Sequence, residues 1–246
     1  MSGDAHSDNG TRSLFRDPEF LALSSASFAR AQAGSTILIA LALYADLFGT
    51  SGVVEGLFGT SFALAQLIAV IPLGRAVDRG DARKYLLAGM VVNVGVFVGF
   101  VFVDSATHVI FLRLFQGLGT MTLWVTGSTI AGQLGPAAER GRWLGAFNQV
   151  GAFSSLAGDI VGGYLLYAHG FTLTYVVLSA ITIAGFLLVL AFMRREPAGR
   201  DDSDATNRER LRQLVDRPPL RAMLVFRALF SMGKMIVLIF LPIYAR

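Results

Sequence analysis

Long apolar stretches separated by short polar connections recur along the chain. Each stretch is close to the roughly 20 residues that a helix needs to cross about 30 Å of hydrocarbon. The stretches lack the alternation of barrel strands, and backbone groups in lipid must be paired internally, so the pattern predicts transmembrane helices. We expect seven spans, at residues 20–48, 53–73, 85–103, 107–134, 143–167, 172–193 and 222–244.

Composition agrees with a polytopic membrane protein. Hydrophobic residues make up 54% of the 246 and charged residues 15%, and the mean hydropathy is +0.58, on the apolar side of globular usage. The chain has no cysteine, and its three histidines lie in the N-terminal tail or near span ends. We therefore expect no metal site and no cofactor, and coupling to a proton or another ion gradient stays open.

Basic residues are confined to alternate connections. Sixteen Lys and Arg residues lie in the N-terminal tail and in the connections after spans two, four and six, and none lies in the connections after spans one, three and five. Positively charged connections stay on the cytoplasmic side, so the N-terminus is predicted to be cytoplasmic in a multi-pass protein of the cell membrane. The high isoelectric point is then a topology signal, and the lipid bilayer, rather than nucleic acid, is the expected partner.

The start of the second apolar region echoes the start of the first. The sequence VLIFLPIYAR at 237–246 matches ILIALALYAD at 37–46 at five of ten positions without a gap, and Pro218 and Ala222 stand 200 positions after Pro18 and Ala22. Chance matches among Leu, Ile and Ala are the alternative, but the shared Pro and Tyr favour duplication, as in transporters built from two parallel halves. We divide the chain into a tail (1–19), a six-helix domain (20–193), a charged cytoplasmic linker (194–221) and the first helix of an incomplete second domain (222–246).

Three short motifs carry a resemblance to the major facilitator superfamily. The loop GRAVDRGDARK after span two is similar to the family's cytoplasmic signature, with departures at Ala76, Gly80 and Asp81 and matches at Gly74, Asp78, Arg79, Arg83 and Lys84. The stretch FLRLFQGLG in span four resembles the second signature through Arg113, Gln116, Gly117 and Gly119. The stretch AGDIVGG in span five resembles the antiporter signature but has Asp159 where that motif has proline, and Gly158 and Gly162 form a face for close helix packing.

The resemblance covers essentially the whole chain. It implies an all-α, six-helix bundle plus a seventh transmembrane helix, the first part of a 12-helix fold. The missing half would come from a longer product, a second polypeptide or self-association. It also implies secondary active transport of a small-molecule solute by alternating access, with the loop at 74–84 as a latch at the inner gate. No enzyme activity is expected.

Ionisable residues within the spans are the candidates for solute or ion binding, because each costs about 3 kcal/mol at depth unless it has a partner or faces water. Arg113 and Asp159 lie at similar predicted depths, so we hypothesise an ion pair between them, either structural or broken during coupling. In the resembled fold, Arg30, Arg113 and Lys234 would face one cavity beside Gln116. That cationic set favours a small polar or anionic solute, although Arg30 could instead reach the cytoplasmic face.

Two other functions stay open at this point. One is a seven-helix photoreceptor with Lys234 as the chromophore site; the predicted cytoplasmic N-terminus and the absence of a carboxylate one turn earlier argue against it. The other is efflux of drugs or metabolites by proton antiport, which the substitution of Asp159 in the antiporter signature weakens.

Overall fold

The computed structural model describes residues 14–194, together with positions 218, 222, 225, 226, 229 and 230. The chain divides into two compact units, Met1–Gly199 and Arg200–Arg246. In the second unit the described positions are helical, and the rings of Phe226 and Phe230 stack with centroids 6.3 Å apart. Lys234 and most of the seventh predicted span lie outside the described residues.

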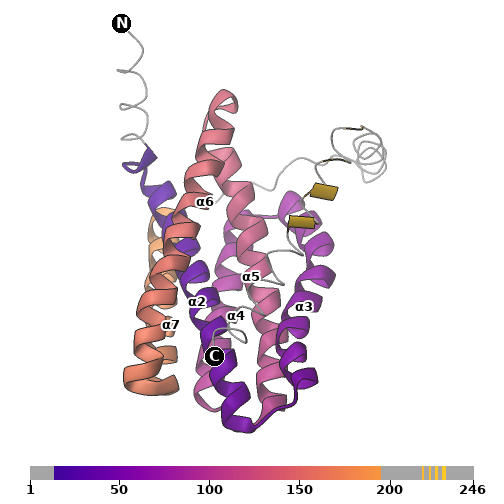
Figure 1. Cartoon of the computed structure of the whole chain (residues 1–246). Helices are drawn as coiled ribbons and strands as arrows, with labels where there is room; N and C mark the ends of the chain where they lie inside the picture. The colour runs from indigo at the N-terminus through magenta and orange to yellow at the C-terminus, as the bar shows by residue number, and fades with distance from the viewer. Residues whose placement is uncertain (1–13, 195–217, 219–221, 223–224, 227–228, 231–246) are drawn as a thin grey trace, which may run out of the picture. The chain divides into compact units, whose positions relative to one another are not determined.

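The described part of the first unit consists of helices joined by short turns, without a strand (Figure 1). In chain order the elements are α2 (Pro18–Phe48), α3 (Gly52–Arg79), α4 (Ala82–Val101), α5 (Ala106–Leu134), the 3-10 turn η1 (Ala137–Glu139), α6 (Arg140–Ala157), the π-helical turn η2 (Gly158–Gly162) and α7 (Gly163–Phe192). Five helical stretches in this region are long and apolar enough to cross a membrane, and the last is the continuous run Ala137–Phe192.

Polar residues at the connections fix the helix ends. The carboxylate of Asp17 accepts hydrogen bonds from the backbone N–H groups of Glu19 at 2.9 Å and Phe20 at 3.4 Å, and Pro18 follows it at the first helical position. This satisfies donors that a helix start leaves unpaired. At the other end of α2, Gly49 adopts a left-handed conformation with φ of 56°, which glycine tolerates without strain.

The run Ala137–Phe192 crosses the bundle twice, because the chain reverses at Gly170. Gly170 has φ of 76° and ψ of −172°, far from helical values. Before it, Trp143 lies against Phe20 near the start of α2, with ring centroids 5.4 Å apart. Just after it, Phe171 stacks on Tyr44 near the end of α2, with centroids 4.2 Å apart. The chain then returns to the start of α2, where Arg194 pairs with Glu19 at 3.7 Å.

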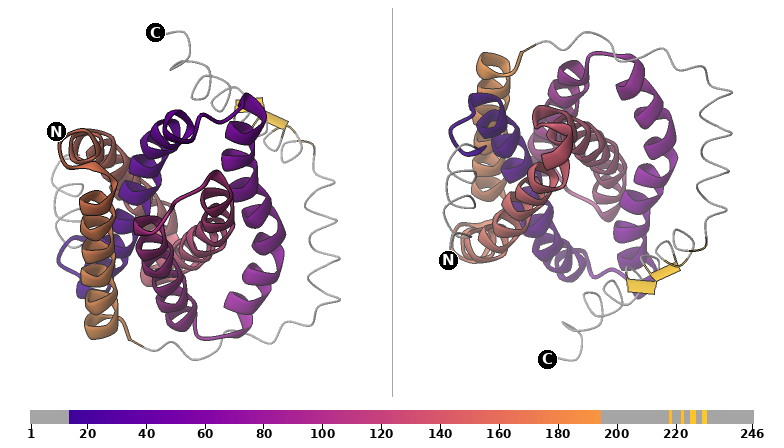
Figure 2. Two further views of the ribbon diagram at one scale, coloured as in Figure 1. Left: turned by 90° about the horizontal axis from the view of Figure 1, so that it is seen from below. Right: turned by 90° about the horizontal axis from the view of Figure 1, so that it is seen from above.

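The reversal gives the unit six membrane crossings, and it separates predicted spans five and six at the expected connection. Within the unit α5 packs against α2, α3, α4 and α6, and α7 packs against α2 and α4. Helix α3 packs mainly on α5 and lies at one edge, as the views along the bundle in Figure 2 show. Its outer face therefore carries several exposed apolar side chains, including Val53, Leu67 and Ile68.

The two ends of the unit differ in charge. One end holds the start of α2, the turn between α3 and α4, η1, and the end of α7; we call it the basic end, and its Lys and Arg residues are Arg16, Arg75, Arg79, Arg83, Lys84, Arg140, Arg142 and Arg194. The opposite end, which we call the Gly170 end, holds the turns at 49–51, 102–105 and 170. No Lys or Arg lies in these three turns. The structure thus gathers the alternate basic connections on one side of the bundle.

Candidate functional site

The loop with the first signature joins α3 to α4 at the basic end. Asp78 and Arg79 form the last turn of α3, and Asp81 caps α4 by accepting a hydrogen bond from the backbone N–H of Arg83 at 3.1 Å. The Arg83 guanidinium donates to the backbone carbonyl of Leu190 at 2.6 Å. This bond fastens the start of α4 to the last turn of α7, while Lys84 is exposed.

Glycine positions in this loop have different structural roles from the ones the motif suggests. A Cβ added to Gly74 would meet nothing within 4 Å, so close packing does not require glycine there. A Cβ added to Gly80 would lie 2.7 Å from the Tyr85 ring and 2.9 Å from the Ala76 carbonyl oxygen. Gly80 stands one place earlier than the glycine of the family pattern. A larger residue at this position would require Tyr85 or the backbone of the turn to shift.

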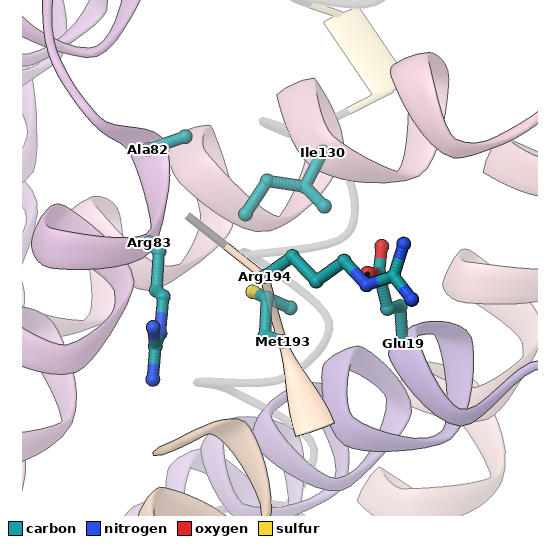
Figure 3. Close-up of a pocket in the computed structure, with 6 residues that line it drawn as sticks. All are labelled: Glu19, Ala82, Arg83, Ile130, Met193 and Arg194. Carbon is teal, nitrogen blue, oxygen red and sulfur yellow. Dashed lines mark ion pairs between the residues drawn. The ribbon is translucent and has the colours of Figure 1, made fainter. Parts of the chain in front are cut away.

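A small pocket at the basic end brings together the ends of several helices (Figure 3). Arg194 reaches toward Glu19 and pairs with it at 3.7 Å, whereas Arg83 points away from that pair. Ala82, Ile130 and Met193 complete the lining. Because Arg194 is 91% exposed, this ion pair contributes little to stability.

Arg113 is buried at the contact between α5 and α3. Its Nε donates to the carbonyl of Phe58 at 3.0 Å, and its Nη1 donates to Oε1 of Gln116 at 2.6 Å. The guanidinium also lies 4.2 Å from the centroid of the Phe62 ring. Beside it, a Cβ on Gly117 would stand 2.5 Å from the Phe62 carbonyl oxygen, so glycine permits this close approach.

The hypothesised ion pair between Arg113 and Asp159 is wrong: within the described residues the two side chains have separate partners. Asp159 lies in η2, which packs against α2, α6 and α7, and its Oδ1 is 2.5 Å from the hydroxyl oxygen of Ser35 on α2. Depth along the two helices was comparable, but the helices turn these side chains toward different neighbours. Arg113 faces α3, and Asp159 faces α2.

Glycines of η2 press directly on α2. A Cβ added to Gly158 would collide with the backbone of Gln32, and one added to Gly162 would collide with the Thr36 side chain. Thr36 is completely buried, and its hydroxyl oxygen lies 3.0 Å from the carbonyl oxygen of Gln32 and 3.1 Å from that of Gly158, so its one hydrogen has two acceptors within reach. The two glycines therefore lie at a close helix contact of the kind predicted for them.

Arg30 lies near the middle of α2 and is partly buried against α6. Its Nη2 and the Ser27 hydroxyl oxygen would each be 3.5 Å from a Cβ placed on Gly151. The Nε of Arg30 and the hydroxyl of Ser27 are buried, and neither has a hydrogen-bond partner among the described residues. No carboxylate in that part of the chain pairs with Arg30. The site therefore presents a guanidinium and a hydroxyl with unused hydrogen-bonding capacity.

Several residues of these contacts were not predicted. Ser35 partners Asp159, and Ser27 and Gly151 adjoin Arg30, yet small hydroxyl residues and glycines occur throughout apolar spans and carry no distinguishing pattern. The spacing of Ser27 and Arg30 by three residues places them on one helix face, which is the signal that could have joined them. The partner helix could not be known from the sequence.

The fold and these buried polar groups define an α-helical, multi-pass membrane protein with polar sites between its spans. The chain belongs to the Major Facilitator Superfamily, whose family model matches residues 23–246. It is 28% identical over 193 residues to the uncharacterized MFS-type transporter YuxJ of Bacillus subtilis, covering 76% of this chain and 48% of YuxJ. It is also 28% identical over 152 residues to the uncharacterized MFS-type transporter MJ1560 of Methanocaldococcus jannaschii, covering 61% and 38% of the two chains.

A third relative has a named solute. The riboflavin transporter RibZ of Clostridioides difficile is 26% identical over 135 residues, covering 54% of this chain and 29% of RibZ. The chain spans about half the length of YuxJ and less of the other two. Membership confirms the resemblance drawn from the motifs. The match extends over Lys234, the residue on which the photoreceptor hypothesis depended, so it favours the transporter family over that hypothesis.

Proposed function

We propose that the chain is the amino-terminal six-helix half, with the first helix of the second half, of a secondary transporter that moves a small polar or anionic solute by alternating access. The observation that carries the anionic preference is Arg30, a guanidinium in the middle of a membrane span without a carboxylate partner among the described residues. Arg113, by contrast, donates to the Phe58 carbonyl and to the Gln116 side chain.

The energetics favour an anion at Arg30. An ionised group within a span costs several kcal/mol unless charge and hydrogen bonds compensate it. A solute carboxylate or phosphate would accept from the guanidinium in the bidentate geometry that arginine supports, and the Ser27 hydroxyl would donate a further hydrogen bond. Anion binding would then offset the free-energy cost of the uncompensated Arg30 charge in the ligand-free protein.

The arrangement of the ends supports an orientation and a gate. With the basic end in the cytoplasm of a cell, the N-terminus is cytoplasmic and the Gly170 end faces outward. The loop with Gly74, Asp78, Arg79, Arg83 and Lys84 then lies at the inner face, where it would latch against the second half. The second half would be supplied by a longer product, another polypeptide or a second copy.

Ligand-induced thermal stabilisation of the purified chain tests the anionic preference. Riboflavin and riboflavin 5′-phosphate form a matched pair, because they differ by a phosphate and because riboflavin is the named solute of RibZ; succinate and tetraphenylphosphonium extend the panel. A ligand at about 100 times its Kd adds about 2.7 kcal/mol of stability. We expect stabilisation by anions, its loss in Arg30→Gln, and its retention in the exposed control Arg16→Gln. Stabilisation by the cation alone, or by anions equally in Arg30→Gln, would contradict the proposal.

A further inference from the structure

The hydroxyl of Ser27 lacks the partner that other buried hydroxyls of the bundle have. Buried serine and threonine side chains in these helices commonly donate to the carbonyl four residues earlier in the same helix, as Ser154, Ser179 and Thr182 do. Ser27 is 3% exposed and has no hydrogen-bond partner among the described residues. Buried polar groups are normally satisfied by protein, water or ligand, so we expect its partner to come from outside the described chain.

Glycine at position 151 on α6 leaves a space against Ser27 and Arg30. At the position that a Cβ of residue 151 would occupy, the Ser27 hydroxyl oxygen and the Arg30 Nη2 are each 3.5 Å away. No other atom outside the adjoining backbone of α6 comes within 4 Å of that position. We call this space the Gly151 site. An atom placed in it lies between a hydroxyl and a guanidinium.

Packing of the helices does not explain the glycine. A Cβ on Gly158 or Gly162 would collide with α2, whereas the two 3.5 Å distances at Gly151 are ordinary van der Waals contacts. Alanine would therefore fit at position 151 and would favour the helix. Its methyl group would, however, fill the space beside two donors that have unused hydrogen-bonding capacity.

We infer that Gly151 lines the solute site, and that one oxygen of the solute's carboxylate or phosphate group occupies the Gly151 site and accepts hydrogen bonds from Ser27 and Arg30. The inference rests on the proposed function and adds to it a residue of α6 and the class of group that is bound. Ser27 and Gly151 are buried and Arg30 is only partly buried, so the oxyanion approaches from the side of the guanidinium.

A water molecule is the competing occupant of the Gly151 site. Water can also accept from the Ser27 hydroxyl and the Arg30 guanidinium. It leaves the charge of Arg30 uncompensated, whereas an oxyanion supplies both the acceptor and the opposite charge. A neutral ester of the same acid lacks that charge, so it should not replace the anion.

Thermal stabilisation of the purified full chain, titrated with succinate, riboflavin 5′-phosphate and neutral dimethyl succinate, tests this inference. The first two compounds separate a carboxylate from a phosphate. For the anion that binds the wild type, Gly151→Ala should raise the apparent Kd about tenfold or more, while its ligand-free melting temperature stays the same or rises. Ser27→Ala should raise the Kd about 10- to 100-fold, because it removes a hydrogen bond to a charged group.

Two matched controls accompany these variants. Gly145 lies on the same helix as Gly151, is exposed and has open space around it, so Gly145→Ala should keep the wild-type Kd. The Ser24 hydroxyl is buried without a partner, as that of Ser27 is, but it does not lie within 4 Å of the Gly151 site. Ser24→Ala should therefore also keep the wild-type Kd.

The outcomes separate this inference from the proposed function. A wild-type Kd in Gly151→Ala, together with loss of the response in Arg30→Gln, would overturn the inference alone. A ligand-free Gly151→Ala chain that melts well below the wild type would show a packing role for the glycine and would also overturn it. Equal stabilisation by dimethyl succinate and succinate would contradict binding of an oxyanion. No response to either anion in the wild type would overturn both proposals.

Discussion

Arg30 and Arg113 show how the surroundings of one residue type decide its role. Both are arginines in apolar helices, and both were predicted to face a solute path. Arg113 is enclosed by the Phe58 carbonyl, the Gln116 amide and the Phe62 ring, so it acts as a clamp between α3 and α5. The Nε of Arg30 lacks a partner among the described residues, which is the basis of the proposed anion site.

Substitutions of Arg113 and Arg30 are predicted to have opposite effects on stability. Arg113→Met leaves the buried Oε1 of Gln116 without its donor, while the Phe58 carbonyl keeps the Ser61 hydroxyl, and we expect it to lower the free energy of unfolding by about 1–3 kcal/mol. Arg30→Met removes a charge that nothing described compensates, so it should be neutral or stabilising in the ligand-free chain. Thermal denaturation in detergent measures both. Equal destabilisation by the two substitutions would show that Arg30 has a structural partner after all.

The neighbouring glycines Gly162 and Gly163 offer a matched comparison at the α2 contact. A Cβ at Gly162 collides with the buried Thr36, whereas one at Gly163 makes an ordinary contact of 3.5 Å with Ile39. Overpacking of this kind costs about 1–3 kcal/mol, and alanine at an unobstructed helical position is favourable by up to about 1 kcal/mol. Gly162→Ala should therefore melt at a lower temperature than Gly163→Ala, and the reverse order would refute the close contact.

At the scale of elements, the turn at Gly170 decides whether the apolar run from 137 to 192 crosses once or twice. Its φ of 76° and ψ of −172° belong to a region that side chains disfavour. We expect Gly170→Ala to destabilise the chain by about 1–3 kcal/mol. Gly95 in α4 has open space around its Cα, so Gly95→Ala is the control that should not destabilise. A neutral Gly170→Ala would argue for a helix that continues through this position.

The spans and their ends could be predicted from the sequence because apolar length and capping are local properties. The apolar lengths indicated the spans, and the basic connections indicated one end of the bundle. The rotation of each helix about its axis is not local, since it depends on packing among all six spans. That is why comparable depth wrongly paired Arg113 with Asp159, and why Ser35 was missed. The π-helical turn at η2 was likewise not predicted, because the local pattern remains that of a continuous apolar helix.

At the scale of the whole molecule, six crossings place every basic connection of the described unit at one end. The positions of Trp143 and Arg194 beside the start of α2, and of Phe171 beside its end, establish that alternation. In the proposed function, a unit with this topology needs a second half to complete a solute path and a gate. The account therefore depends first on the orientation of the bundle in the membrane.

Labelling of single cysteines tests that orientation most directly, because the chain has no cysteine of its own. Ser51 is exposed at the Gly170 end, and Ala138 is exposed at the basic end. In intact cells, a membrane-impermeant maleimide should label Ser51→Cys, and it should label Ala138→Cys only after permeabilisation. Labelling of Ala138→Cys in intact cells, with Ser51→Cys protected, would place the basic end outside and contradict the account.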